Sequence, residues 1–412
     1  MILLKSFLKE FPYTVNIRID TCLTNFCVLC CSCVCHTLVR KFLANETKNG
    51  IIIKDKKERT VTMAALTYHE QKKIEQTKRL RSVLKSLPVF VKDFFQYIDQ
   101  STSINTQVAY AYNIQLFFEY LRGNNPIFHN HQLTDFKISD IENLEPSDIE
   151  EFKEYLKVYD YHDKEFTNAE KGIARKLSAL RSFYRFYYKR QYITKNPMDF
   201  VDMPKLHKKE IIRLDIDEIA ILLDYIEQCG EELTGQKKVF YEKTKIRDLA
   251  IFTLFLGTGI RVSECVGLDI SDVDFKNNRI KVFRKGGNEM FVYFGGEVEE
   301  ALQDYINTER AKVTPLPGHE NALFYSIQNK RISVRAVQDL VKKYTEHVTT
   351  KHITPHKFRS TYGTNLYKET GDIYLVADVL GHSDVNTTRK HYAAQDDDHR
   401  RKAATAVQLR EK

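Results

Sequence analysis

Six side chains in the second half of the chain carry the groups that a phosphodiester reaction needs. They are Arg261 in LGTGIRVSE (256–264), Lys285 in FRKGGN (283–288), His356 and Arg359 in TPHKFRSTYG (354–363), and His382 and Tyr392 in GHSDVNTTRKHYA (381–393). Each alone has an ordinary structural interpretation: Arg261 can pair with Glu264, Lys285 can be an exposed hairpin lysine, and His382 can cap a helix. Together they contain every group that cutting and rejoining a phosphodiester requires.

The residue types suit transfer of a phosphoryl group to a tyrosine. Two guanidiniums can each bind two non-bridging oxygens in fork geometry and neutralise the pentacoordinate phosphorus. The Tyr392 phenol can attack phosphorus and store the bond as a phosphotyrosine ester. A hairpin lysine can give a proton to the departing 5′ oxygen, and a histidine can take or position the phenol proton. The sequence shows no carboxylate cluster of the kind that two-metal nucleases use, so we expect no metal and no cofactor.

Local signals place these groups on defined elements. Arg261 follows a Gly-Thr-Gly turn at the start of a predicted helix, and a Thr-Pro pair opens another, on which His356 and Arg359 share a face. Residues 279–294 form two strand-like runs around Lys285, which predicts an antiparallel hairpin with the lysine at its tip. Periodic apolar residues predict further helices at 217–227 and 245–257, so from residue 214 onward the pattern is mixed α/β.

The preceding part of the chain predicts helices. Residues 66–86, 103–122 and 144–157 have helical periodicity or helix-start signals. We expect the second of these to bury a stripe made of Val108, Tyr112, Leu116 (or Ile114), Phe117 and Tyr120. Segment 195–213 breaks the pattern with two prolines and a basic cluster, which predicts a linker between domains, placed at 204–213.

One predicted helix, 171–190, contains seven Lys or Arg residues and no acid. On a helical wheel one side is apolar (Ile173, Leu177, Leu180, Tyr184 and Tyr187) and the opposite side carries Lys171, Arg175, Arg185 and Lys189. The alternative interpretation is a solvated charged face, but acids normally intersperse such a face. We therefore predict DNA contacts from Lys171, Arg175, Arg181, Arg185 and Lys189 of this helix, and from Lys205, Lys208 and Lys209 beyond it.

Overall charge argues little about partners. The chain of 412 residues has a formal net charge of +8, and its first 62 residues supply +5 of it. Those residues also hold six of the eight cysteines, between positions 22 and 35. A zinc site, a secretory signal and a membrane span each fit this segment poorly, and we expect residues 1–62 to be a non-native or disordered upstream segment, with translation starting at Met63. The two remaining cysteines, Cys229 and Cys265, are isolated, which favours a reducing cytoplasm.

From about residue 88 to 400 the sequence resembles the tyrosine recombinases, the family of phage integrases and Xer-type resolvases. Arg261 matches the first catalytic arginine of that family, Lys285 the hairpin lysine, His356 and Arg359 the His-x-x-Arg pair, His382 the later histidine, and Tyr392 the nucleophile. The resemblance implies a helical lead-in (63–87) and a four-helix, SAM-like core DNA-binding domain (88–203). It also implies a mainly helical catalytic domain with a small antiparallel sheet (214–395) and a C-terminal tail helix (396–412).

Three features depart from the family pattern. Tyr392 follows His382 by ten residues, where nine is the commoner interval, so Tyr367, Tyr374 and His391 are conceivable rivals that fit less well. Ser360 stands where a histidine frequently follows the second arginine. The hairpin reads Lys-Gly-Gly-Asn-Glu and lacks a second basic residue.

The resemblance implies a recombinase that acts on double-stranded DNA as a tetramer on two sites, in the cytoplasm and associated with the nucleoid, without a membrane. The resemblance leaves open whether a second, accessory recombinase is needed. It also does not distinguish a role in chromosome-dimer resolution from a role in mobile-element integration. A type IB topoisomerase and a catalytically silent DNA-binding relative are the alternatives from other classes. The tail, with Ala403, Val407 and Leu409, predicts a short helix that must pack on its own domain or on another subunit.

Overall fold

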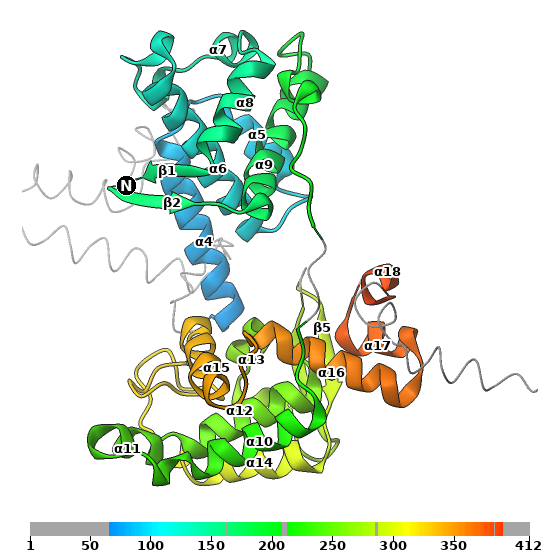
Figure 1. Cartoon of the computed structure of the whole chain (residues 1–412). Coiled ribbons are helices and arrows are strands. Elements are labelled where there is room, and N and C mark those ends of the chain that lie inside the picture. The colour runs from blue at the N-terminus through cyan, green and yellow to red at the C-terminus, as the bar shows by residue number, and fades with distance from the viewer. Residues whose placement is uncertain (1–65, 162, 208–211, 285–286, 383, 390–412) are drawn as a thin grey trace, which may run out of the picture. The chain divides into compact units, whose positions relative to one another are not determined.

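The computed structural model describes residues 66–161, 163–207, 212–284, 287–382 and 384–389 (Figure 1). The upstream segment 1–62, Lys208, Lys209, Lys285, Tyr392 and the tail 396–412 therefore lie outside the described residues.

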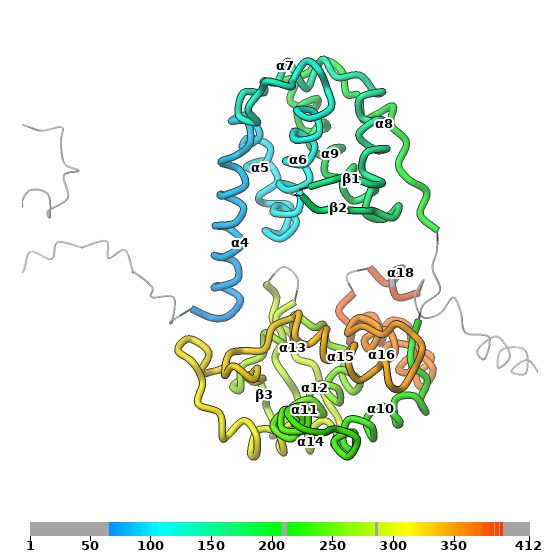
Figure 2. Tube along the Cα trace, turned by 60° about the vertical axis from the view of Figure 1, so that its left-hand side comes forward, coloured from blue at the N-terminus to red at the C-terminus, as the bar shows by residue number. Residues whose placement is uncertain are grey.

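The described residues before 207 form a helical domain with one small hairpin (Figure 2). Its helices are α4 (Tyr68–Lys85), α5 (Val91–Ile98), α6 (Ile104–Asn124), α7 (Ile138–Glu142), α8 (Pro146–Tyr155) and α9 (Glu170–Lys189), with short 3-10 turns at Pro126–Phe128, Leu133–Asp135 and Pro197–Phe200. Strands β1 (Val158–Tyr161) and β2 (Lys164–Thr167) pair antiparallel between α8 and α9. The helices predicted at 66–86, 103–122, 144–157 and 171–190 are confirmed, while the hairpin was not predicted.

Aromatic rings dominate the core of this domain. Phe94, Phe117, Phe118, Phe152 and Phe183 are fully buried, and neighbouring rings meet edge to face, as Phe117 and Phe152 do at 5.0 Å between ring centroids. Such contacts add to the free energy gained by burying the rings. The apolar stripe predicted for α9 is confirmed, since all five of its residues are buried.

One residue of the predicted α6 stripe lies elsewhere. Tyr112 is on the exposed side of α6, where the Arg79 guanidinium of α4 covers its ring at 5.1 Å and donates from Nε to its hydroxyl at 2.9 Å. The prediction that Tyr112 belongs to the core is therefore wrong, because a cation from another helix provides an amphipathic ring with a surface partner. Both Leu116 and Ile114, offered as alternatives, are buried.

The described residues from 212 onward form the mixed α/β part that the sequence predicts. Its helices are α10 (Ile216–Gln228), α11 (Gly235–Glu242), α12 (Lys245–Thr258), α13 (Val262–Gly267), α14 (Gly296–Asn307), α15 (Val334–Val348), α16 (Pro355–Thr370), α17 (Ile373–Leu380) and α18 (Val385–Thr388), with 3-10 turns at Cys229–Glu231, Ile270–Asp272 and Arg310–Lys312. The sheet has the antiparallel order β3 (Val273–Asp274), β4 (Arg279–Phe283) and β5 (Glu289–Tyr293). In the β4–β5 register Phe283 faces Glu289, which confirms the predicted hairpin.

Helix α12 is the central element of this part, packed against α10, α14 and α16. It is apolar on most sides and buries Phe252 and Phe255 completely. Its first turn is fixed by an ion pair between Arg247 Nη2 and Asp248 Oδ1 at 2.6 Å, and the hydroxyl of Tyr344 donates to the same carboxylate at 3.0 Å. Because the helix is rigid, this anchor at its N-terminal end also fixes the position of its C-terminal end, at Gly259.

Candidate active site

The first predicted arginine lies at the junction between α12 and α13. Helix α12 ends at Gly259, whose φ of 62° favours glycine. Arg261 is the residue that precedes the first turn of α13; its backbone N–H donates to Glu264 Oε2 at 2.8 Å, and its Nη1 lies 2.7 Å from Oε1 of the same carboxylate. Glu264 is buried while the Arg261 side chain is one third exposed. The ion pair between Arg261 and Glu264 that the sequence suggested is therefore present. It holds the Arg261 guanidinium at the surface, beside the end of α12.

The second predicted arginine is buried. Thr354 and Pro355 open α16, as predicted, and His356 and Arg359 follow one turn apart with opposite exposure. His356 is exposed, whereas Arg359 is only 2% exposed. Arg359 Nη1 donates to the Gly259 carbonyl at 2.8 Å, and its Nη2 donates to the Leu380 carbonyl. One guanidinium therefore joins the C-terminal ends of α12 and α17.

The later histidine follows directly after α17. Gly381 ends this helix with a φ of 60°, and the His382 N–H donates back to the Ala377 carbonyl at 2.8 Å. The His382 Nδ1 lies 2.7 Å from the hydroxyl of Thr388, which is fully buried on α18. This contact fixes the orientation of the imidazole, and sequence analysis did not identify Thr388, because a threonine six residues away carries no distinctive signal.

These contacts bring together three of the four stretches singled out in the sequence. Arg359 binds the carbonyl of Gly259, two residues before Arg261, and the carbonyl of Leu380, two residues before His382. The β4–β5 hairpin reaches the same place, because Arg284 Nη2 donates to the Val379 carbonyl at 2.8 Å. Lys285 and Tyr392 lie outside the described residues.

The rival tyrosines lie on α16 and α17, each about two helical turns along its helix from the junction. Tyr374 is 71% exposed in the first turn of α17, six residues and therefore about 9 Å along the helix from its C-terminal end. Tyr367 lies on α16 two turns beyond Arg359, about 12 Å along that helix. Ser360 uses its hydroxyl within α16, as a donor to the His356 carbonyl at 3.2 Å.

The basic face predicted on α9 is exposed in the structure. Lys171, Arg175, Arg185 and Lys189 are all exposed on the side of α9 opposite its core stripe, and Lys205 is exposed as well. Arg181 differs, because it is half-buried and donates from Nη2 to the Val201 carbonyl at 2.9 Å. That hydrogen bond gives Arg181 a role in joining α9 to the following turn.

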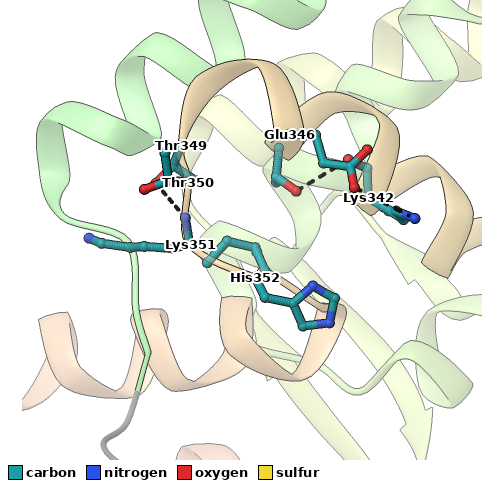
Figure 3. Close-up of a pocket in the computed structure, with 8 residues that line it drawn as sticks. Lys342, Glu346, Thr349, Thr350, Lys351 and His352 are labelled. Atoms are coloured by element: carbon teal, nitrogen blue, oxygen red, sulfur yellow. Dashed lines mark hydrogen bonds and ion pairs between the residues drawn. The ribbon is translucent and has the colours of Figure 1, made fainter.

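A separate cavity of about 220 Å³ lies where α15 ends and the chain turns toward α16 (Figure 3). Its lining holds Lys342, Lys351 and His352 beside Glu346. Lys342 pairs with Glu346 at 3.6 Å, and Lys351 pairs with Glu218 at 2.6 Å, so neither lysine adds an uncompensated charge. Among the described residues no group of three or more His, Cys, Asp or Glu side chains could hold a metal ion. None of the helices in the described ranges is long and apolar enough to cross a membrane.

Comparisons with known proteins cover both parts of the chain. The family model "Phage integrase, N-terminal SAM-like domain" matches residues 91–191, and "Phage integrase family" matches residues 206–399. Tyrosine recombinase XerC of Caldanaerobacter subterraneus subsp. tengcongensis is 34% identical over 327 residues, which cover 77% of this chain and 86% of that protein. The chain belongs to the tyrosine recombinase family.

Other relatives of this recombinase point the same way. Tyrosine recombinase XerD of Staphylococcus epidermidis is 30% identical, over 72% of this chain and 90% of that protein. In fold, the recombinase is similar to the Tn1549 transposon integrase in complex with a circular intermediate DNA, with a TM-score of 0.55, 21% identity, and coverage of 76% of this chain and 98% of that one. XerH bound to a palindromic difH substrate gives a TM-score of 0.54 at 17% identity, over 80% of this chain and 94% of that one. The chain is thus a DNA-binding tyrosine site-specific recombinase, with the SAM-like and integrase folds that the resemblance implied.

Proposed function

We propose that this recombinase cuts DNA with Tyr392, and that Arg261, Lys285, His356, Arg359 and His382 complete its catalytic set. The phenol oxygen attacks phosphorus, a phosphotyrosine ester forms at the 3′ end, and the bond to the 5′ oxygen breaks. Lys285 protonates that leaving oxygen, and His356 or His382 accepts or positions the phenol proton. Attack by a 5′ hydroxyl of another strand reverses the step and releases the tyrosine, so no external energy source is consumed.

The observation that supports this proposal is the bridge that Arg359 makes between Gly259 and Leu380. It places a guanidinium between the segment that carries Arg261 and the segment that carries His382. Two arginines held on rigid elements are preorganised for the charge that develops on phosphorus, and such donors contribute most when they need no rearrangement. This arrangement favours phosphoryl transfer without a metal.

The test is covalent capture on a nicked suicide substrate, read on a denaturing gel. Tyr392→Phe should abolish the protein–DNA adduct while half-site binding stays within about twofold of wild type, because phosphate contacts come from other residues. Tyr374→Phe is the matched control and should form the adduct normally, because Tyr374 lies in the first turn of α17, at the other end of the helix from the carbonyls that Arg284 and Arg359 bind. An adduct that persists in Tyr392→Phe would overturn the assignment of the nucleophile.

We further propose the organisation in which this chemistry operates. Residues 88–203 form the core DNA-binding domain, 214–395 form the catalytic domain, and 204–213 link them. The exposed cations of α9, with Lys205, Lys208 and Lys209, contact the DNA backbone. The recombinase acts in the cytoplasm at the nucleoid as a tetramer on two sites, as a Xer-like enzyme or a mobile-element integrase, alone or with an accessory recombinase.

A further inference from the structure

Arg284 stands at the entrance of the β4–β5 turn and has no role in the catalytic set proposed above. Its N–H donates to the Asn288 carbonyl at 2.8 Å, and its own carbonyl accepts from the Gly287 N–H at 3.0 Å. These two bonds close the turn in which Lys285 directly follows Arg284 in the chain. The backbone position of Arg284 therefore sets one end of that turn.

The side chain of Arg284 leaves the hairpin and reaches α17. Its Nη2 donates to the Val379 carbonyl at 2.8 Å, across 95 residues of sequence. The guanidinium lies against Gly381, and a Cβ at this position would overlap it. Gly381 is thus needed twice, for its left-handed φ of 60° and for the close approach of Arg284.

Two arginines hold consecutive carbonyls at the end of α17. Arg284 binds Val379 and Arg359 binds Leu380. The last carbonyls of a helix lack partners within the helix and carry its partial negative charge, so they suit guanidinium donors. This pair of bonds connects the β4–β5 hairpin and helix α16 to the same helix end, one residue before His382.

Packing alone does not account for an arginine at position 284. Its Nε and Nη1 are buried and have no hydrogen-bond partner in the part of the chain that the structure describes. Burial lowers the pKa of Arg284, and the nearby Arg261 also lowers it, while Glu264 and Asp378 act in the opposite direction. An apolar side chain of similar length would fill the place without leaving donors unpaired.

We propose that Arg284 is a positioning residue for the reaction: it fixes the β4–β5 hairpin to the C-terminal end of α17, and this attachment is what allows the hairpin turn to present Lys285 to the scissile phosphate. The proposal rests on the proposed function of Lys285 as the acid that protonates the 5′ oxygen. Arg284 itself touches no substrate atom in this role.

The test compares cleavage of an ordinary nicked substrate with one that carries a 5′-bridging sulfur, which needs little protonation to leave. Arg284→Met keeps the side-chain length and removes the hydrogen bond. It should slow cleavage of the ordinary substrate by about 10- to 100-fold, since small misplacements of a catalytic group cost that much, and sulfur should restore most of the rate, as we also expect for Lys285→Ala. The double variant Arg284→Met/Lys285→Ala should be no slower than Lys285→Ala alone.

Arg279→Met is the matched control. Arg279 is the first residue of β4, five residues before Arg284, where it pairs with Asp274 at 2.9 Å and its guanidinium covers the Phe291 ring at 4.1 Å. Its replacement removes one positive charge from the hairpin, as Arg284→Met does, but leaves the contact between Arg284 and α17 intact, so cleavage should stay at the wild-type rate.

The outcomes separate the two proposals. If sulfur rescues Lys285→Ala but not Arg284→Met, Arg284 acts on the phosphate or on folding, and the inference is overturned while the proposed function stands. If sulfur rescues neither variant, Lys285 is not the acid and both proposals fail. An Arg284→Met protein that cleaves the ordinary substrate at the wild-type rate would also overturn the inference.

Discussion

Replacing Arg359 with alanine tests both the stability and the chemistry of the junction. The side chain is 2% exposed, and its two terminal nitrogens serve the carbonyls of Gly259 and Leu380. Arg359→Ala removes both donors from buried acceptors and leaves a cavity where the long side chain was. The C-terminal ends of α12 and α17 then lose their common partner.

The size of the effect follows from these contacts. A buried polar group left without its partner costs about 1–3 kcal/mol, and an unfilled cavity adds to that. We expect Arg359→Ala to lower the free energy of unfolding by roughly 3–5 kcal/mol, and the melting temperature by about 10 °C for a domain of this size. Arg359→Lys, which can serve one carbonyl, should fall between this variant and wild type. Cleavage per folded molecule should drop about 10²-fold or more, because a preorganised charge is lost.

The assay pairs thermal unfolding by circular dichroism with single-turnover cleavage, measured well below the melting temperature of each variant. Arg247→Ala is the matched control, because Arg247 is also a buried arginine of the same domain and lies at the opposite end of α12. Arg247→Ala should destabilise the protein, because the buried carboxylate of Asp248 loses its ion-pair partner, yet cleavage per folded molecule should stay near wild type. An equal loss of cleavage in both variants would show that instability, and not the charge of Arg359, causes the defect. A melting temperature unchanged in Arg359→Ala would refute the bridging role.

Three further predictions concern the acid, the DNA face and the tail. Lys285→Ala should lose about 10²-fold or more in cleavage of an ordinary substrate and regain much of it with a 5′-bridging sulfur; no regain would show that Lys285 is not the acid. Neutralising Arg175 and Arg185 together should flatten the slope of the logarithm of the DNA-binding constant against the logarithm of the salt concentration by about 1 to 2 units. An unchanged slope would show that the charged face of α9 is solvated and does not contact DNA. Truncation after Asp398 should spare half-site binding and abolish cooperative binding and strand exchange together, and a truncated protein that recombines at the wild-type rate would contradict this.

Local patterns in the sequence were sufficient for the elements that carry the site. The α9 stripe, the helix start at Thr354 and the β4–β5 hairpin each follow from periodicity or turn chemistry within a few residues, and the structure confirms them. The candidate site residues are predicted from the order and spacing of four motifs, together with the chemistry of their side chains and the family resemblance.

Contacts between residues that are far apart in the chain could not be predicted from local sequence patterns. Tyr112 has the spacing of a core residue, and only the position of Arg79, 33 residues earlier, gives it a partner at the surface. The bond between Arg284 and Val379 spans 95 residues, so no local pattern distinguishes Arg284 from an exposed hairpin arginine. The β1–β2 hairpin has only four residues in each strand, too few for a clear alternation.

The spacing of cations along α9 has a consequence for the shape of the DNA it can meet. The four exposed residues fall into two pairs, Lys171 with Arg175 and Arg185 with Lys189. At 1.5 Å per residue the members of a pair are about 6 Å apart along the axis, and the two inner residues are about 15 Å apart. That gap is comparable to the width of roughly 12 Å of the major groove of B-form DNA. On the proposed DNA face, this spacing is long enough for the two pairs to meet phosphates on either side of one groove, and the buried stripe of α9 keeps the spacing fixed.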